Sequence, residues 1–313
     1  MSDLVAAHNF PTVSAPAAMR NFPHVRDNER DRLLDYVTLS PEMSVLDIQA
    51  AGGYLSDEVY RRLNGAVSLV CVEPNPELRA RLNPAFRALA DPVEQFASIP
   101  DHSIDLALGL IGLHHSASHR ATIAETWRVL KPGGEMAICD VPRASRLASW
   151  FNEFVDAHCP AGHDGNFPEV GSMSRLAAGV GFVAITEEVR DVPWVFGERT
   201  QIATFFQGLF NLDLPCAEID RALDSYFTIH ELGDTCLVEW QLSYCHARKP
   251  GCYARDPRAS AKNLQGAQYL RGGAGPSDRP RSGCGGYRHS VCALRRDWRG
   301  LSHLVPQHGW EWR

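Results

Sequence analysis

The sequence has few lysines and no long apolar run. Only Lys131, Lys249 and Lys262 are lysines among the 31 basic residues, a bias that we attribute to a GC-rich genome. No stretch approaches the roughly 20 apolar residues that a membrane-spanning helix needs. The N-terminus also lacks the basic start and apolar segment of a secretory signal. We therefore expect a cytoplasmic protein with no membrane partner.

Clustered positive charge is missing from the first 250 residues, which hold 20 Lys and Arg against 33 Asp and Glu. Because proteins that bind nucleic-acid phosphates need a basic surface, this balance argues against a nucleic-acid partner. Residues 251–313 hold 11 basic against 4 acidic residues and are rich in Gly, Arg, Pro and Ser. With no sustained apolar period, they are predicted to form a disordered tail after a domain of residues 1–250.

Cysteines at short paired spacings are absent from residues 1–250, which favours buried thiols over a disulfide framework. Cys71 and Cys139 fall in strand-like apolar runs, where core packing is expected. A metal site is suggested by the spacing of His158, Cys159 and His163, but no second cluster completes it. The tail holds four further candidate ligands, Cys284, Cys292, His303 and His308. Their spacing matches no compact zinc module, so we expect no metal.

Apolar strand-like runs alternate with helical patterns through the first half of the chain. The strand-like runs are residues 44–49, 67–74, 104–111 and 135–141, and the helical patterns are residues 28–39, 56–63, 76–89 and 119–130. This alternation predicts βαβ units, and therefore an α/β fold with a mainly parallel sheet and helices on both faces.

The rhythm changes after Val141. Residues 142–182 combine helical segments with a polar loop, and we interpret them as an insertion or lid. Residues 183–196 and 234–247 alternate apolar and polar side chains, as partly exposed antiparallel strands do. The segment between these two strands is predicted to be helical.

A glycine-containing turn follows the first strand, in the run from Asp47 to Gly53. A backbone without side chains lets a ligand approach, and the following helix presents free N–H groups. Glu73 lies 20 positions after Gly53, at the end of the next strand, where a carboxylate accepts hydrogen bonds from ribose hydroxyls. The pair favours a nucleotide-like ligand; the alternatives are a tight turn and a solvated acid at a strand end.

Four segments make the pattern more specific: VLDIQAAGG, VCVEPNPELRARL, IPDHSIDLALGLIGLHH and ETWRVLKPGGEMAICDV. In this order they resemble the successive motifs of class I S-adenosylmethionine (SAM) dependent methyltransferases of the small-molecule, methyltransferase type 11-like group. The resemblance is strong over residues 40–145 and looser to about residue 250. It implies a Rossmann-like seven-stranded sheet with a terminal antiparallel hairpin, SAM as cofactor and a small-molecule methyl acceptor.

The resemblance also implies a set of cofactor residues. These are Asp47, Gln49, Ala51, Gly53, Glu73, Pro74, Glu94, Gly109, Leu110 and Ile111. In this arrangement Asp47 and Gly53 flank the methionine part of SAM and Glu73 holds the ribose. The segment from Glu94 to Ala97 borders the adenine, and the segment from Gly109 to Ile111 lines the methyl-donating side. The family usually has glycine where this chain has Gln49 and Ala51, so the turn is expected to lie tighter against the ligand.

His114 and His115 stand where the third predicted strand ends, at the mouth of the expected cleft. A histidine there is a natural base for an oxygen or carbon acceptor; the alternatives are a structural role or contact with the substrate. An aromatic set is a second candidate feature: Trp150, Phe151, Phe154, Trp194, Phe196, Phe205 and Phe206. These residues either wall an apolar acceptor pocket or form core.

Two other function classes fit parts of this pattern. A nicotinamide-dependent oxidoreductase shares the turn and the ribose acid, but the RVLKPGG segment disfavours it, and no tyrosine is followed four positions later by a lysine. A noncatalytic methyltransferase-like protein that binds a metabolite or a partner is favoured by Gln49 and Ala51. The sequence leaves the acceptor and the oligomeric state open.

Overall fold

The computed structural model describes residues 16–251 of the 313-residue chain. These residues belong to a unit that extends from Met1 to Ala254. The predictions for the tail, including its four candidate zinc ligands, lie outside the described residues. No helix of the described part is long and apolar enough to cross a bilayer.

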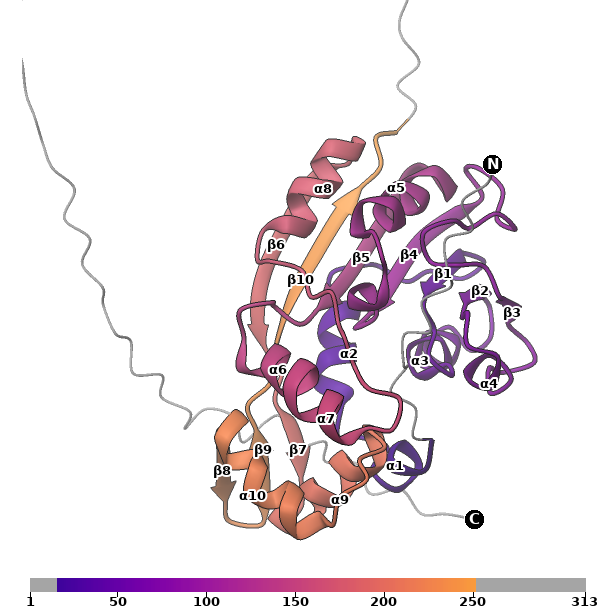
Figure 1. The fold of residues 1–313 in the computed structure, drawn as a ribbon. Coiled ribbons are helices and arrows are strands. Elements are labelled where there is room, and N and C mark those ends of the chain that lie inside the picture. Colours follow the sequence, from indigo (N-terminus) through magenta and orange to yellow (C-terminus); the bar gives the residue numbers. More distant parts are fainter. Residues whose placement is uncertain (1–15, 252–313) are drawn as a thin grey trace, which may run out of the picture. The chain divides into compact units, whose positions relative to one another are not determined.

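The main sheet has seven strands in the order β3-β2-β1-β4-β5-β10-β6. They are β1 (Ser44–Ile48), β2 (Ser68–Val72), β3 (Arg87–Leu89), β4 (Ile104–Leu110), β5 (Leu130–Asp140), β6 (Val183–Asp191) and β10 (Gln241–Arg248). The first five are parallel, and β10 pairs antiparallel with both β5 and β6. The predicted Rossmann-like sheet with a terminal antiparallel pair is confirmed (Figure 1).

Side-chain alternation along the strands divides the interior into two cores. In β1, Val45 belongs to one hydrophobic cluster, whereas Leu46 and Ile48 belong to the other, as the period of two in a strand requires. The first core includes side chains of α1 (Pro16–Asn21), α2 (Asp27–Leu34) and α3 (Tyr54–Arg62); the second includes side chains of α5 (His119–Val129) and α8 (Ser172–Val180). Helices therefore cover both faces of the sheet.

A second, antiparallel sheet of three strands and two helices lie near the N-terminal end of β10 (Figure 1). The strands of this sheet are β7 (Trp194–Phe196), β9 (Thr235–Val238) and β8 (Ile229–Leu232), in this order. The two helices are α9 (Arg199–Leu209) and α10 (Cys216–Tyr226). Each late segment predicted as one strand thus divides between the two sheets. In the first segment the division falls at Pro193, which has no N–H to donate to a ladder.

Residues 76–89 do not form the single predicted helix. The structure has a short α4 (Pro76–Arg79), capped by the Asn75 side chain, and then a turn and β3. Proline disfavours helical conformation in the residue before it, so the Asn83-Pro84 step prevents the helix from continuing. The strand β3 was missed because it is short and mostly exposed.

The segment interpreted as an insertion or lid begins with a nearly continuous helix. It contains α6 (Arg146–Ser149), a π-helical turn (Trp150–Val155) and α7 (Asp156–His158). A loop then leads to α8, which packs against α5 and β6. The last part of the segment therefore covers the sheet, whereas its first part joins the aromatic core.

Candidate active site

The turn after β1 holds two residues with side chains in the left-handed region. Gln49 has φ 63° and Ala51 has φ 45°, followed by Gly52 at 93° and Gly53 at 101°. Such a conformation costs a residue with a side chain about 1–2 kcal/mol, a cost that glycine avoids. The backbone at positions 49 and 51 thus has the conformation that glycine favours.

Glu73, at the end of β2, anchors this turn. Its carboxylate accepts hydrogen bonds from the backbone N–H groups of Ala51 and Asn75, each at 2.8 Å. Glu73 is buried, and this burial raises the pKa of its carboxyl, an effect that the two hydrogen bonds oppose. The side chain ties the turn to the neighbouring strand.

Beside the turn is a cavity of about 430 Å³, a size that suits a small-molecule ligand. Asp47, Gln49, Ala51 and Gly52 form part of its wall. Asp47 is buried and accepts a hydrogen bond from Ser56 Oγ at 2.5 Å. Burial raises the pKa of Asp47 to about 7, against the effect of the Ser56 hydrogen bond. A cation in this cavity would favour the ionised carboxylate.

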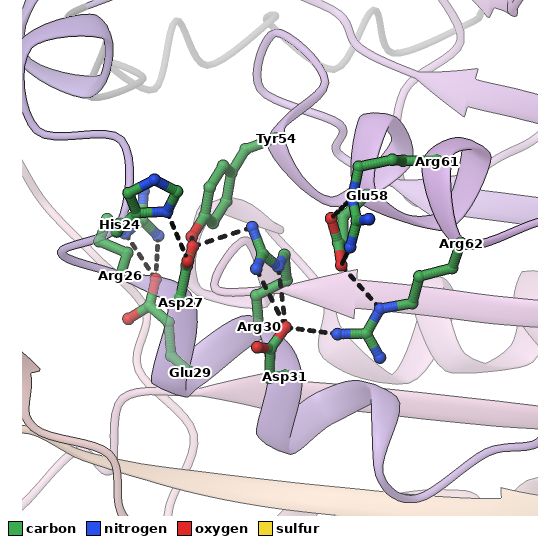
Figure 2. A network of polar contacts seen from close by, with 10 residues as sticks. All are labelled: His24, Arg26, Asp27, Glu29, Arg30, Asp31, Tyr54, Glu58, Arg61 and Arg62. Carbon is green, nitrogen blue, oxygen red and sulfur yellow. Dashed lines mark hydrogen bonds and ion pairs between the residues drawn. The ribbon is translucent and has the colours of Figure 1, made fainter. Parts of the chain in front are cut away.

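A charged network joins α2 and α3 (Figure 2), and two of its residues, Arg26 and Tyr54, line this cavity. Tyr54 donates to Asp27 at 2.7 Å, and Arg30 pairs with Asp27 at 2.9 Å. Arg26 donates to the fully buried Glu29 at 2.5 Å and lies over the ring of Tyr54, 5.5 Å from its centroid. The network therefore holds Arg26 and Tyr54 in place at the cavity wall.

No motif in the sequence pointed to Arg26. Its partner Glu29 also accepts a hydrogen bond from Trp194 Nε1, 165 positions away, at 3.0 Å. Burial raises the pKa of Glu29, while Arg26 and the Trp194 hydrogen bond lower it. The Trp194 contact has no local signature because of its sequence separation, whereas i,i+3 ion pairs such as Arg26–Glu29 and Asp27–Arg30 are common on helices and do not mark a site.

His114 forms a buried pair with Asp140. Its Nδ1 lies 2.9 Å from Asp140 Oδ1, and Asp140 Oδ2 accepts the His114 backbone N–H at 2.8 Å. His114 follows β4 and Asp140 ends the adjacent parallel strand β5, so the sheet brings them together. Asp140 was missed by the sequence reasoning, although its place at the end of the strand next to the histidines was an available signal.

His115 and His163 lie beside His114, with ring centroids 4.0 and 5.4 Å from that of His114. Burial lowers the pKa of His115 well below its usual value and that of His163 to about 3. Both rings are therefore neutral at pH 7. The expected neighbours of His163, namely His158 and Cys159, do not join this group.

A second, smaller cavity of about 80 Å³ lies against His114 and His115. Aromatic side chains form much of its wall: Phe151, Trp194, Phe210 and Trp240. Of the predicted aromatic set, Phe151 and Trp194 reach this cavity. Trp150, Phe205 and Phe206 are fully buried in the adjoining core, where they form edge-to-face ring pairs.

The two cavities adjoin, because they share part of their lining. The shared residues are Arg26, Gln49, Ala51, Leu110 and Leu209. Gln49 stands in this common wall and is nearly buried, with its Oε1 close to Gly112.

The other predicted cofactor residues lie outside the larger cavity. Ile111 lines the smaller one, and Gly53 caps the N-terminus of α3. Pro74 is exposed, and Gly109 faces Ile138, which belongs to the second of the two hydrophobic cores. Glu94 accepts hydrogen bonds from Ser116 Oγ at 2.7 Å and from the Ala117 N–H at 2.6 Å. Glu94 lines neither cavity, and its contact with adenine stays a prediction.

The sheet order, the glycine-type turn and the two cavities define an α/β protein with the architecture of class I methyltransferases. A family model described as a methyltransferase domain matches residues 20–188. This match covers more than half of the chain, and the chain belongs to that family. The resemblance seen in the sequence is thereby confirmed: the chain belongs to the methyltransferase family and has its fold.

Solved structures support the same fold. The YcgJ protein from Bacillus subtilis is 16% identical, with a TM-score of 0.52, over 72% of this chain and 99% of that chain. A putative methyltransferase from Bacillus halodurans is 16% identical, with a TM-score of 0.51, over 71% of this chain and 98% of that one. No curated protein sequence matches this chain significantly.

Proposed function

We propose that the protein transfers a methyl group from SAM to a small-molecule acceptor held in the smaller cavity, which we call the aromatic cavity. The observation that carries the proposal is the pair of adjoining cavities, one beside the glycine-type turn and the other beside His114 and His115. Methyl transfer needs an in-line approach of acceptor and methyl donor, which adjoining sites provide.

The larger cavity suits the charges of SAM. Asp47 and Asp57 offer carboxylates to its amino group and sulfonium, and Arg20, Arg26 and Arg81 offer guanidinium groups to its carboxylate. Glu73 is not part of the cavity lining but anchors the turn beside it, and it would hold the ribose because each of its oxygens can accept one donor besides the backbone N–H that it already binds. Leu110 lines both cavities and would lie near the methyl group.

The smaller cavity favours an acceptor with an apolar body and one polar group. Its aromatic wall packs against the body, and His114 or His115 orients the polar group or accepts its proton. The Asp140 carboxylate keeps hydrogen on Nδ1 of His114, which leaves Nε2 as the proton acceptor. This arrangement suits a hydroxyl acceptor, whose proton must leave.

Gln49 favours a second candidate function, a noncatalytic protein that binds a metabolite. Its side chain lines both cavities, and in the proposed arrangement it would stand between the methyl donor and the acceptor. A protein that only binds its ligand tolerates such a barrier.

Transfer of labelled methyl from SAM to a panel of phenols, amines and thiols distinguishes the two functions. In a chelator-containing buffer, we expect transfer to at least one acceptor, and a rate about 10²–10⁴ times lower in His114→Gln. His158→Gln is the matched control, because His158 lies outside both cavities. SAM binding without transfer to any acceptor would favour the noncatalytic function.

A further inference from the structure

Three histidine side chains from two distant segments meet at the wall of the aromatic cavity. His114 and His115 form a 3₁₀ turn after β4, and His163 comes from the loop between α7 and α8. One ring nitrogen of each lies within 4.8 Å of the others, and all three residues are buried. Among residues 16–251, this is the one group of at least three potential metal ligands that comes so close together.

Hydrogen bonds fix which nitrogen of His114 carries hydrogen. Its Nδ1 faces Asp140 Oδ1, and a carboxylate oxygen accepts rather than donates. In the neutral imidazole, Nδ1 therefore carries the hydrogen and Nε2 carries the lone pair. This Nε2 is buried and has no hydrogen-bond partner.

The same logic applies to His163, whose Nδ1 lies 3.1 Å from Asn152 Oδ1. Gly165 fixes the orientation of the Asn152 amide, because its N–H donates to Oδ1 at 2.8 Å and its carbonyl accepts from Nδ2 at 2.9 Å. Nδ1 of His163 must then donate, and Nε2 again carries a lone pair. This second Nε2 is also buried without a partner.

Two buried lone pairs without a donor are unfavourable, because each has lost its hydrogen bonds to water and gained none in the protein. A metal cation bound by neutral imidazoles would remove this cost. Imidazole nitrogens suit zinc and its neighbours, whereas magnesium and calcium prefer oxygen ligands. Ring partners such as Asp140 and Asn152 are the outer contacts that orient histidine ligands.

We propose that His114, His115 and His163 bind a divalent first-row transition metal, with Zn²⁺ the preferred ion. Tetrahedral zinc–nitrogen bonds of 2.0–2.1 Å place the nitrogens about 3.4 Å apart, so separations that now reach up to 4.8 Å must shorten by up to about 1.4 Å. The proposal revises our expectation that the protein holds no metal. It stands independently of methyl transfer, because it concerns the binding of the ion alone.

A metal at this position would lie at the wall of the aromatic cavity, which His114 and His115 also line. There a Lewis acid binds and acidifies a hydroxyl or thiol. The base role of His114 belongs to the metal-free protein, because the proton and the metal both need Nε2.

Zinc titration tests the site in the full chain carrying Cys252→Ser, Cys284→Ser and Cys292→Ser, which removes the three thiols of residues 251–313. Calorimetry in competition with a chelator should give one tight Zn²⁺ site. In His163→Gln the affinity should fall by more than about 100-fold, which exceeds the typical 10–100-fold effect of losing an outer-shell partner. His158→Gln should bind as tightly as the parent, because His158 is outside the cluster.

Cobalt supplies a second readout. Co²⁺ bound by three histidines should give the intense visible absorption of a four-coordinate ion, and His163→Gln should lose it. Thermal unfolding without metal shows whether His163→Gln is folded; if it is not, His115→Gln takes its place with the same expectation. Zinc affinity and cobalt spectra that are the same in the parent and the folded histidine variant would overturn the proposal.

Discussion

Replacing Gln49 with glycine tests whether the side chain in the wall between the cavities limits cofactor binding. Gln49 is in the left-handed region at φ 63°, is nearly buried and lines both cavities. Gln49→Gly removes the side chain and leaves a residue that adopts this conformation without strain. The change therefore acts on both the stability of the turn and the space available to a ligand.

The expected change in stability is small. Relief of the left-handed conformation gains about 1–2 kcal/mol, but the greater freedom of glycine in the unfolded chain costs about 0.5–1 kcal/mol. Loss of the packing of the glutamine side chain offsets much of the remainder. We expect the free energy of unfolding to change by less than about 1 kcal/mol, measured by chemical denaturation.

The expected change in SAM affinity is larger. Moving the nearly buried Gln49 side chain aside exposes its two methylene groups, at about 0.8 kcal/mol each, a cost of about 1–2 kcal/mol that the variant does not have. SAM should therefore bind roughly tenfold more tightly to Gln49→Gly, since 1.4 kcal/mol corresponds to a factor of ten. Isothermal titration calorimetry measures this difference directly.

Glu42→Gly is the matched control, because Glu42 also has a left-handed φ of 65° but is exposed and lines neither cavity. It should change stability without changing SAM affinity. Equal or weaker SAM binding by Gln49→Gly, with Glu42→Gly unchanged, would refute the idea that the glutamine obstructs the cofactor.

Three further predictions concern the same site. The folded pKa of Asp47 is about 7, above its ordinary value of 3.8, so the unfolded chain binds fewer protons between these values and stability falls as pH rises. At pH 8 the free energy of unfolding of Asp47→Asn should thus exceed that of the parent by up to about 4 kcal/mol, which thermal unfolding detects as a higher unfolding temperature. The difference in stability should shrink toward pH 4; a difference that is independent of pH would contradict this. Ala51→Gly should stabilise the protein by up to about 1 kcal/mol in chemical denaturation, because it relieves φ 45°; a loss of stability would refute the strain argument. Asp140→Asn should shift the His114 ring hydrogen from Nδ1 toward Nε2 in nitrogen-15 spectra of the imidazoles, and an unchanged tautomer would show that Asp140 does not set it.

The central strands could be predicted from the sequence because each is buried on both faces and therefore forms a continuous apolar run. This holds for β1, β2 and β4. The strand β3 has no such signal, because its side chains are largely exposed. Alternation in the late segments correctly indicated strands, but it could not show that β6 and β7 belong to different sheets, since sheet membership depends on distant partners.

The candidate site was predictable only where its residues follow strands. The turn from Asp47, the acid Glu73 and the pair His114 and His115 all stand at strand ends. The contribution of His163 depends on the path of a loop between two helices, which local sequence does not determine.

The most direct test of the account is calorimetric titration of SAM into the full-length protein, with NADH as the comparison ligand. We predict micromolar binding of SAM, none of NADH, and loss of SAM binding in Glu73→Ala, whose turn loses its anchor. The matched control Glu77→Ala, an exposed position outside both cavities, should bind as the parent does. Absence of SAM binding by the folded protein, or equal binding by a folded Glu73→Ala variant, would contradict the assignment of this turn as the cofactor site.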